Sequence, residues 1–471
     1  MLLGHNEISE HIQIHPNTLT THAAVFGSTG SGKTGLLLGM VEELYNENVP
    51  VILVDIKGDM ANIGIRDDFM DVRCLTPGGT HGEAVNVLAD LRDKEKAFTA
   101  ISALLAMIGE DNDPLRSTAY SFLCAIAENS TYLTLDTLVY ACTNPGFRHL
   151  GALSLDDAFP HKKRMALAQK LNTLVASPSF APWRAGIDLD IDELASGGIT
   201  VYSVAHLTDP AEQSFAISFL LNEVLRWTRK QSGSNDLRLV LAIDECVGLL
   251  PPVANPPTKE PIMLLLKQAR AFGVGLVLAT QNPVDIDYKA MSNCNTWIVG
   301  RMTAERDRAR VVSGMQSAGV GEPEVLNQWI AGLAPRQFIM ASRDNYGERF
   351  KSKDVGCELR GPMIPTEIQE MYEEGYIQYV TAEQAVAAAR ARNGISEDDI
   401  MEPISDSEEA VDQNIEDDYL TSDWMVNAQD YKNAGLLEKA LDLVSFVPSP
   451  VWYATFGIGL WAGVNYLVTL L

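Results

Sequence analysis

Residues 27–34 spell the pattern G-x-x-x-x-G-K-T, the spacing of a phosphate-binding P-loop. Its glycines let the backbone curl until successive N–H groups point at a phosphate, while the lysine reaches the β- and γ-phosphates and the threonine hydroxyl ligates Mg²⁺. The apolar run 23–26 predicts a short buried strand before the loop, and leucines at helical spacing in 35–45 predict a helix after it. The motif therefore predicts a site for a nucleoside triphosphate and Mg²⁺, bound by Gly27, Ser28, Thr29, Gly30, Ser31, Gly32, Lys33, Thr34 and Gly35.

A second acidic motif follows the apolar run 239–243, where Asp244 and Glu245 stand side by side. This is a Walker B pattern, in which the aspartate at the strand tip holds Mg²⁺ and the glutamate orients and deprotonates the water that attacks the γ-phosphate. An ordinary acidic strand end is the alternative. Because a P-loop precedes it in the same chain, we predict Asp244 as a metal ligand and Glu245 as the catalytic base.

Four further polar residues stand at the ends of predicted strands or helices. Gln281 could hydrogen-bond the γ-phosphate or its attacking water, or simply form a turn before a proline. Asp55 follows the buried run 49–54, where it could serve the nucleotide site or cap a loop. An arginine supplied across a subunit boundary can neutralise transition-state charge, and Arg301 and Arg270 are the two candidates, with a salt bridge as the alternative for each.

Short apolar strands alternate with helices over much of the chain. The predicted strands are 199–204, 237–243, 274–279, 296–299 and 337–341, and the predicted helices between them are 210–230, 259–272 and 303–312. This alternation predicts an α/β fold with a mostly parallel sheet covered on both faces. The stretch 88–183 is instead helical in pattern, which predicts an all-α insertion between sheet strands.

We divide the chain into a P-loop half of the core (1–90), a helical insertion (91–190), a Walker B half (191–345), a helical extension (346–393), an acidic linker (394–430) and a hydrophobic segment (444–471).

The composition limits the function classes. A net charge of −26, half of it after Ile395, argues against a broad surface that coats nucleic acid but leaves room for a narrow basic channel. The six cysteines show neither a C-x-x-C pair nor metal-site spacing, so we expect reduced thiols, as in the cytosol.

Four separated blocks resemble the bacterial HerA-like ATPases of the HerA/FtsK superfamily, including the proteins called helicase HerA-like. The blocks are 27–34, 51–59, 239–245 and 265–301, and the resemblance covers roughly residues 1–345. It implies a RecA-like core, a homo-oligomeric ring that is usually a hexamer, ATP hydrolysis with Mg²⁺, and a pumped polymer that is typically double-stranded DNA. By position it gives the nucleotide roles to Lys33, Thr34, Asp244, Glu245 and Gln281, and the trans-acting role to Arg301 or Arg270.

The end of the chain changes character twice. Residues 394–423 are acidic and poor in large apolar side chains, which predicts a disordered linker. Residues 444–471 contain no charged side chain, and 451–471 alone would be about 31 Å long as a helix. We expect a C-terminal transmembrane helix, with a buried core helix as the alternative. The protein would then be a single-pass protein of the bacterial inner membrane, touching lipid through this segment and keeping its ATPase domain in the cytoplasm.

Three functions fit these observations. The first is a membrane-held ring motor that translocates DNA, like a helicase. The second is a membrane-anchored ATPase that energises protein transport or remodelling. The third is a nucleotide-dependent scaffold whose ring recruits an effector such as a nuclease. No motif marks the residues that would line a pore, so the sequence leaves the cargo open.

Overall fold

The computed structural model describes residues 1–377, except for 67, 69, 80, 82, 87–93, 111–116, 131–132, 185–186, 318, 320–322 and 344. The described residues fall in one compact unit, Met1–Tyr379. The predicted linker 394–430 and the predicted transmembrane segment 444–471 lie outside them. None of the helices that the structure does describe is long and apolar enough to cross a membrane.

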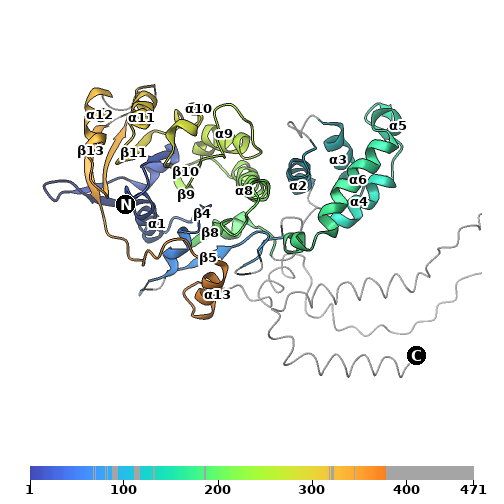
Figure 1. The fold of residues 1–471 in the computed structure, drawn as a ribbon, viewed down its shortest axis with the longest axis horizontal. Helices are drawn as coiled ribbons and strands as arrows, with labels where there is room; N and C mark the ends of the chain where they lie inside the picture. The colour runs from blue at the N-terminus through green and yellow to red at the C-terminus, as the bar shows by residue number, and fades with distance from the viewer. Residues whose placement is uncertain are drawn as a thin grey trace, which may run out of the picture. The chain divides into compact units, whose positions relative to one another are not determined.

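An eleven-stranded sheet forms the centre of the unit, in the order β2-β1-β13-β12-β11-β3-β10-β9-β4-β8-β5 (Figure 1). Neighbouring strands are parallel from β11 to β5 and antiparallel from β11 to β2. The prediction of a mostly parallel α/β sheet, consistent with a RecA-like P-loop core, is confirmed. In sheet order the strands are His11–Gln13, Leu2–His5, Asn345–Ser352, Gln337–Ser342, Thr296–Gly300, Ala23–Phe26, Phe272–Thr280, Ser234–Ile243, Val51–Asp55, Ile199–Ser203 and Val72–Leu75.

Both faces of the parallel strands are covered, which explains their continuous apolar sequence. Every residue of β3, β4, β8 and β11 is buried. Alternate side chains enter two separate cores, with Ile52 and Val54 on one face and Val51 and Leu53 on the other. The first face is covered by α8 (Pro210–Lys230), α9 (Lys259–Gln268), α11 (Glu305–Ser317) and α12 (Pro323–Ala331), and the second by α1 (Lys33–Asn46) and α13 (Pro365–Glu373).

A group of helices separates β5 from β8 in the sequence and lies beside α8 in Figure 1. It consists of α2 (Lys94–Met107), α3 (Thr118–Asn129), α4 (Leu135–Thr143), α5 (Leu155–Ala158) and α6 (His161–Ala176). The prediction of a purely helical insertion was wrong in one detail. Strands β6 (His149–Leu150) and β7 (Leu153–Ser154) form a hairpin, because Gly151 at φ 60° allows the tight turn between them.

Several element boundaries also differ from the predicted ones. The predicted helix 259–272 ends as α9 at Gln268, and β10 already begins at Phe272 after the 3₁₀ turn η5 (Ala269–Ala271). The predicted last strand, 337–341, is followed by β13, whose polar sequence hid it because it belongs to the antiparallel part of the sheet. The remaining short elements are α7 (Ile191–Leu194), α10 (Tyr288–Met291), η1 (Pro16–Thr21), η2 (Met60–Gly64), η4 (Pro178–Arg184) and η6 (Pro283–Asp285).

Helix α13 closes the outer edge of β5, the last strand on the parallel side. The Tyr372 hydroxyl donates to the Cys74 carbonyl at 2.8 Å and accepts from the Cys74 N–H at 3.0 Å. Both groups are buried. The Cys74 carbonyl also accepts from the Glu83 N–H at 3.2 Å, so the main contribution of Tyr372 is to pair the Cys74 N–H of this edge strand.

We therefore expect Tyr372→Phe to lower the free energy of unfolding by about 1–3 kcal/mol, because the buried Cys74 N–H would lose its partner. Amide exchange at 72–75 should also accelerate. Urea denaturation and hydrogen exchange measure the two effects. Tyr376→Phe is the matched control, since that ring is 43% exposed. Equal stability of the two variants would show that the hydroxyl does not hold α13 on the sheet.

Candidate functional site

The strand order brings the two predicted motifs to one edge of the sheet. Strand β10 lies between β3, which leads into the P-loop, and β9, which leads into Asp244. The Gly27 N–H donates to the Thr280 carbonyl at 3.3 Å, and the Cys246 N–H donates to the Ala279 carbonyl at 3.0 Å. The P-loop, the segment after β9 and the segment after β10 are therefore joined directly by backbone hydrogen bonds.

The P-loop has the conformation that its glycines predict. Gly30 and Gly32 have φ values of 76° and 91°, which favour glycine, and Gly32 caps the N-terminus of α1. The loop closes on itself through a hydrogen bond from the Ser31 N–H to the Ser28 carbonyl at 3.0 Å. A Cβ atom on Gly27 would lie only 2.4 Å from the Ser31 hydroxyl oxygen. This tight turn at a helix N-terminus is a cradle that an anion can enter.

Lys33 lies buried against the segment that follows β9. Its ammonium donates to the Asp244 carbonyl at 3.3 Å and lies 3.7 Å from the Glu245 carboxylate. Burial lowers the pKa of Lys33, and the negative charge of Glu245 opposes that shift. The side chain of Lys33 is thus held in place by Asp244 and Glu245.

Asp244 is fully buried, yet neither of its carboxylate oxygens has a hydrogen-bond partner among the described residues. Burial raises the pKa of this carboxyl, while the charges of Lys33 and Lys57 oppose the rise. An unsatisfied buried carboxylate is costly, and a cation beside it removes the cost. The oxygen donors of Asp244 and Thr34 are of the kind that Mg²⁺ prefers, so the residues present fit this ion.

Glu245 has a partner on each carboxylate oxygen. The Thr280 hydroxyl donates to Oε1 at 2.7 Å, and the Lys57 ammonium binds Oε2 at 2.9 Å. Burial alone would raise the pKa of Glu245, but Lys33, Lys57 and the Thr280 hydroxyl together hold it below its usual value. The side chain is therefore a fixed, ionised carboxylate.

Gln281 is tied to the P-loop itself. Its side-chain Oε1 accepts a hydrogen bond from the Thr29 hydroxyl at 2.8 Å. A movement of Thr29 when a phosphate binds to the P-loop would therefore move Gln281, because the two side chains are hydrogen-bonded.

Asp55 occupies the loop-capping arrangement. Its carboxylate is fully buried and accepts from the Gly58 N–H at 2.7 Å and the Met60 N–H at 3.2 Å. Burial raises the pKa of Asp55 to about 7, and the Gly58 hydrogen bond opposes the rise while Asp244 adds to it. Asp55 thereby shapes the loop that carries Lys57.

The two predicted arginines lie at opposite ends of the parallel strands. Arg301 follows the carboxyl end of β11, and Arg270 precedes the amino end of β10. The Arg301 carbonyl accepts from the Ser28 N–H at 3.0 Å, which places Arg301 against its own P-loop, with an exposed side chain. Arg270 is also exposed, but it lies in η5, at the end of β10 far from Thr280. The structure thus brings Arg301 to the site and separates Arg270 from it.

Three contributors to the site went unpredicted, namely Lys57, Thr280 and Arg336. The Arg336 N–H donates to the Ser31 carbonyl at 2.8 Å, while its guanidinium pairs with Asp354 at 2.6 Å and donates to the Ser352 and Lys353 carbonyls at 3.0 Å. Lys57 and Thr280 could have been found as polar residues at the ends of strands β4 and β10. Their link to Glu245 depends on the strand order.

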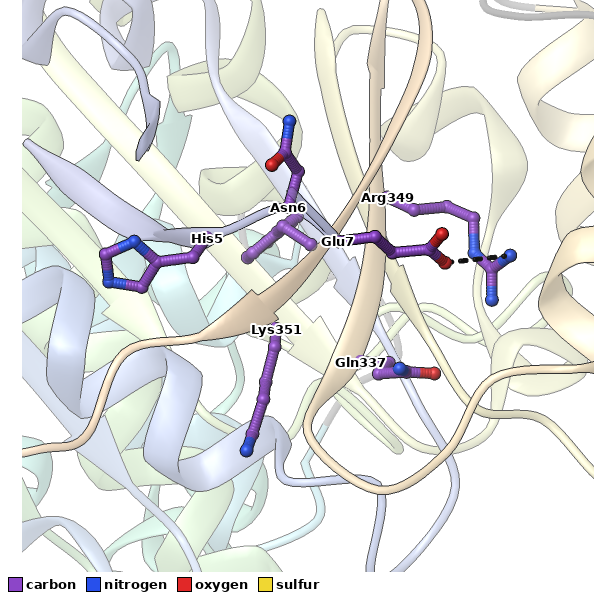
Figure 2. A pocket seen from close by; sticks show the side chains of 7 residues that line it. His5, Asn6, Glu7, Gln337, Arg349 and Lys351 are labelled. Carbon is purple, nitrogen blue, oxygen red and sulfur yellow. Dashed lines mark ion pairs between the residues drawn. The ribbon is translucent and has the colours of Figure 1, made fainter. Parts of the chain in front are cut away.

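A small pocket of about 170 Å³ lies elsewhere, among β1, β12 and β13 (Figure 2). Figure 2 shows Glu7 and Arg349 turned toward each other, and this ion pair measures 3.6 Å. His5 and Lys351 point away from that pair. The P-loop and Walker B residues do not line this pocket, so we assign it no part in the site.

Comparisons with known proteins agree with this geometry. Residues 2–145 match the family model described as DUF87, helicase HerA, central domain. The chain is 23% identical over 310 residues to the DNA double-strand break repair helicase HerA of Sulfurisphaera tokodaii, an alignment that covers 64% of this chain and 59% of that protein. It thus spans only part of the length of the curated relatives that it matches.

Solved structures share the fold. VirB4 of Thermoanaerobacter pseudethanolicus superposes with a TM-score of 0.52 at 14% identity, covering 75% of this chain and 96% of VirB4. The plasmid coupling protein TrwB in complex with GDPNP gives a TM-score of 0.53 at 16% identity, covering 74% of this chain and 88% of TrwB. These structures show the fold alone, and the family model, the HerA relative and the two motifs support a HerA-like P-loop ATPase.

The glycines of the P-loop allow a direct test of the cradle. A Cβ on Gly30 would meet open space, whereas a Cβ on Gly32 would lie 2.9 Å from Arg336 Cγ and 3.2 Å from its Cα. Both positions have a positive φ, so alanine costs about 1–2 kcal/mol at either one. We expect Gly30→Ala to weaken nucleotide binding by about tenfold and Gly32→Ala to weaken it at least tenfold more. Isothermal titration measures both, and equal affinities would exclude Arg336 as a constraint on the loop.

Proposed function

We propose that this chain is a Mg²⁺-dependent ATPase that forms a homo-oligomeric ring, most simply a hexamer, and translocates double-stranded DNA while tethered to a membrane. The observation that carries the ATPase is the buried Asp244 carboxylate, which has no hydrogen-bond partner in the part of the chain that the structure describes. It lies beside Lys33 and an ionised Glu245, next to the P-loop.

Each residue has a role that its position supports. Thr34 and Asp244 would hold Mg²⁺, which neutralises charge on the phosphates. The N–H groups of the P-loop bind phosphate oxygens, and Lys33 moves from the Asp244 carbonyl to the β- and γ-phosphates. Glu245 orients the attacking water and accepts its proton. Gln281 contacts the γ-phosphate or that water and passes the contact to the P-loop through Thr29.

A ring would let an arginine of one subunit complete the site of the next. Arg270 suits this trans role because it lies far from its own P-loop and is exposed. Arg301 is the second candidate, since its exposed side chain stands at the rim of the site.

DNA is the proposed cargo because of the relatives. One is named a DNA double-strand break repair helicase and another a plasmid coupling protein, for which a complex with ADP and Mg²⁺ is also described. The net charge of −26 favours the alternative, an ATPase that acts on proteins or serves as a scaffold for an effector such as a nuclease, because acidic surfaces repel DNA.

The central experiment measures ATP hydrolysis by the full-length protein with and without duplex DNA at low salt. We expect the wild-type rate to rise with DNA. Lys33→Ala should abolish nucleotide binding, and Glu245→Gln should retain binding but lose at least a hundredfold in turnover, because binding and proton transfer use different groups. A Glu245→Gln protein with wild-type turnover would contradict the assignment of the base. An ATPase with no response to DNA and no DNA binding would favour the protein-directed alternative.

The membrane tether is proposed from residues 444–471, with the ATPase domain in the cytoplasm of a bacterial cell. The length of the uncharged segment supports it, since a helix satisfies its own backbone polar groups in lipid. Lys432 and Lys439 stand on the side that should remain cytoplasmic, and the acidic linker 394–430 would leave the ring free to orient.

Membrane fractionation tests the tether. Full-length protein should stay in the membrane pellet after carbonate washing, and a chain ending at Asp442 should be released. Full-length protein that is soluble without detergent would instead indicate that 444–471 is a buried or inter-subunit helix.

A further inference from the structure

Among the described residues, Lys57 is the partner of Glu245 that comes from a loop outside the P-loop and the sheet strands. It lies in the loop between β4 and η2, and its side chain is 33% exposed while that of Glu245 is 7% exposed. Strand β4 pairs with β9 on the side away from β10. Lys57 therefore reaches Glu245 from the flank opposite to the P-loop.

The two oxygens of Glu245 are engaged on both flanks. Thr280 holds Oε1 from β10, and Lys57 holds Oε2 from the β4 loop, with Lys33 farther from Oε2 at 3.7 Å. A water that is to lose a proton to Glu245 must itself hydrogen-bond a carboxylate oxygen. Both lysines lie at the same oxygen, Oε2. Lys33 belongs to the P-loop and would move to the phosphates, whereas Lys57 belongs to a loop held by hydrogen bonds to Asp55.

Hydrogen bonds fix the conformation of the loop that carries Lys57. Asp55 binds the N–H groups of Gly58 and Met60, and Gly58 adopts a φ of 95°. The Met363 N–H donates to the Gly58 carbonyl at 3.0 Å, and a Cβ on Gly58 would lie 3.3 Å from the Met363 backbone. The position of Lys57 is therefore set in part by a contact between Gly58 and Met363, which lies 305 residues later in the chain.

The segment that contains Met363, residues 353–364, is called the strap here. Asn62 holds it beside the Lys57 loop, donating to the Gly361 carbonyl at 2.8 Å and accepting from the Arg360 N–H at 3.1 Å. At its other end the strap is fixed to α1, where Lys353 pairs with Glu43 at 2.7 Å and the Gly356 N–H donates to Glu42 at 2.7 Å. The strap thus connects the helix that follows the P-loop with the loop that carries Lys57.

We propose that Lys57 is a latch that occupies Glu245 in the resting ATPase, and that hydrolysis requires the strap and its loop to withdraw it. The inference rests on the proposed ATPase function and adds a positioning residue that controls it. In this arrangement the Thr280 hydroxyl orients Glu245, and removal of Lys57 frees Oε2 for the attacking water.

The test uses full-length protein without DNA and compares Lys57→Met with Lys57→Arg. Methionine keeps the length of the side chain but loses the ion pair, so kcat should rise by about two- to fivefold, the size of effect that a partly exposed ion pair can exert. KM for ATP should change less than about twofold, because Lys57 is not placed at the phosphates. Arginine keeps the charge, so Lys57→Arg should hold kcat near the wild-type value.

Three controls separate the possible outcomes. Lys162→Met removes an exposed lysine of α6 and should leave the rate unchanged. Lys57→Met combined with Glu245→Gln should lose the gain, because the gain acts through Glu245. Thermal melting of each variant excludes unfolding as the cause of a lost rate.

An unchanged or lower kcat in folded Lys57→Met would overturn the latch and make Lys57 a supporting partner of Glu245. The proposed function is judged separately. It fails if Lys33→Ala and Glu245→Gln hydrolyse ATP like the wild type, whatever Lys57→Met does.

Discussion

The structure depends on a small group of charges buried at the carboxyl edge of the sheet. Asp244 and Glu245 follow one strand, and two lysines reach them from opposite flanks, Lys33 from the P-loop and Lys57 from the β4 loop. Burying such charges is costly unless they are paired, and Asp244 is left without a hydrogen-bond partner among the described residues. A cation beside Asp244 and a triphosphate beside Lys33 would therefore stabilise this group of charges.

The strand order makes that cluster possible. Because β10 lies between β3 and β9, Thr280 and Gln281 reach both motifs, one through Glu245 and the other through Thr29. Apolar strands buried on both faces leave no room for these polar groups within the sheet, so they gather where the strands end. Two consecutive residues thus connect the acidic motif with the P-loop: the Thr280 side chain binds Glu245, and the Thr280 carbonyl and the Gln281 side chain bind the P-loop.

The strap adds a connection that does not pass through the sheet. It joins α1 to the Lys57 loop and then leads into α13, whose Tyr372 closes the edge of β5. A movement of α13 would consequently reach the loop that carries Lys57 without disturbing the central strands.

The sequence by itself determined the P-loop, the acidic pair 244–245 and the mostly parallel sheet, because each has a local pattern. The glycine spacing fixes a turn, and apolar runs of strand length alternate with helices. The sequence also indicated a site role for Gln281, because this residue directly follows an apolar run of strand length. It left Asp55 between two roles, and only its hydrogen bonds to Gly58 and Met60 favour the loop cap.

Tertiary structure alone decided which strand ends meet. The contacts of Lys57 and Thr280 with Glu245, of Arg336 with the P-loop and of the strap with Gly58 join residues 35 to 305 positions apart. No local pattern encodes such a pairing, since the order of strands in a parallel sheet follows from how helices pack across it. The two arginines illustrate the point, because similar positions at element ends put Arg301 beside the P-loop and Arg270 at the far edge of the same sheet.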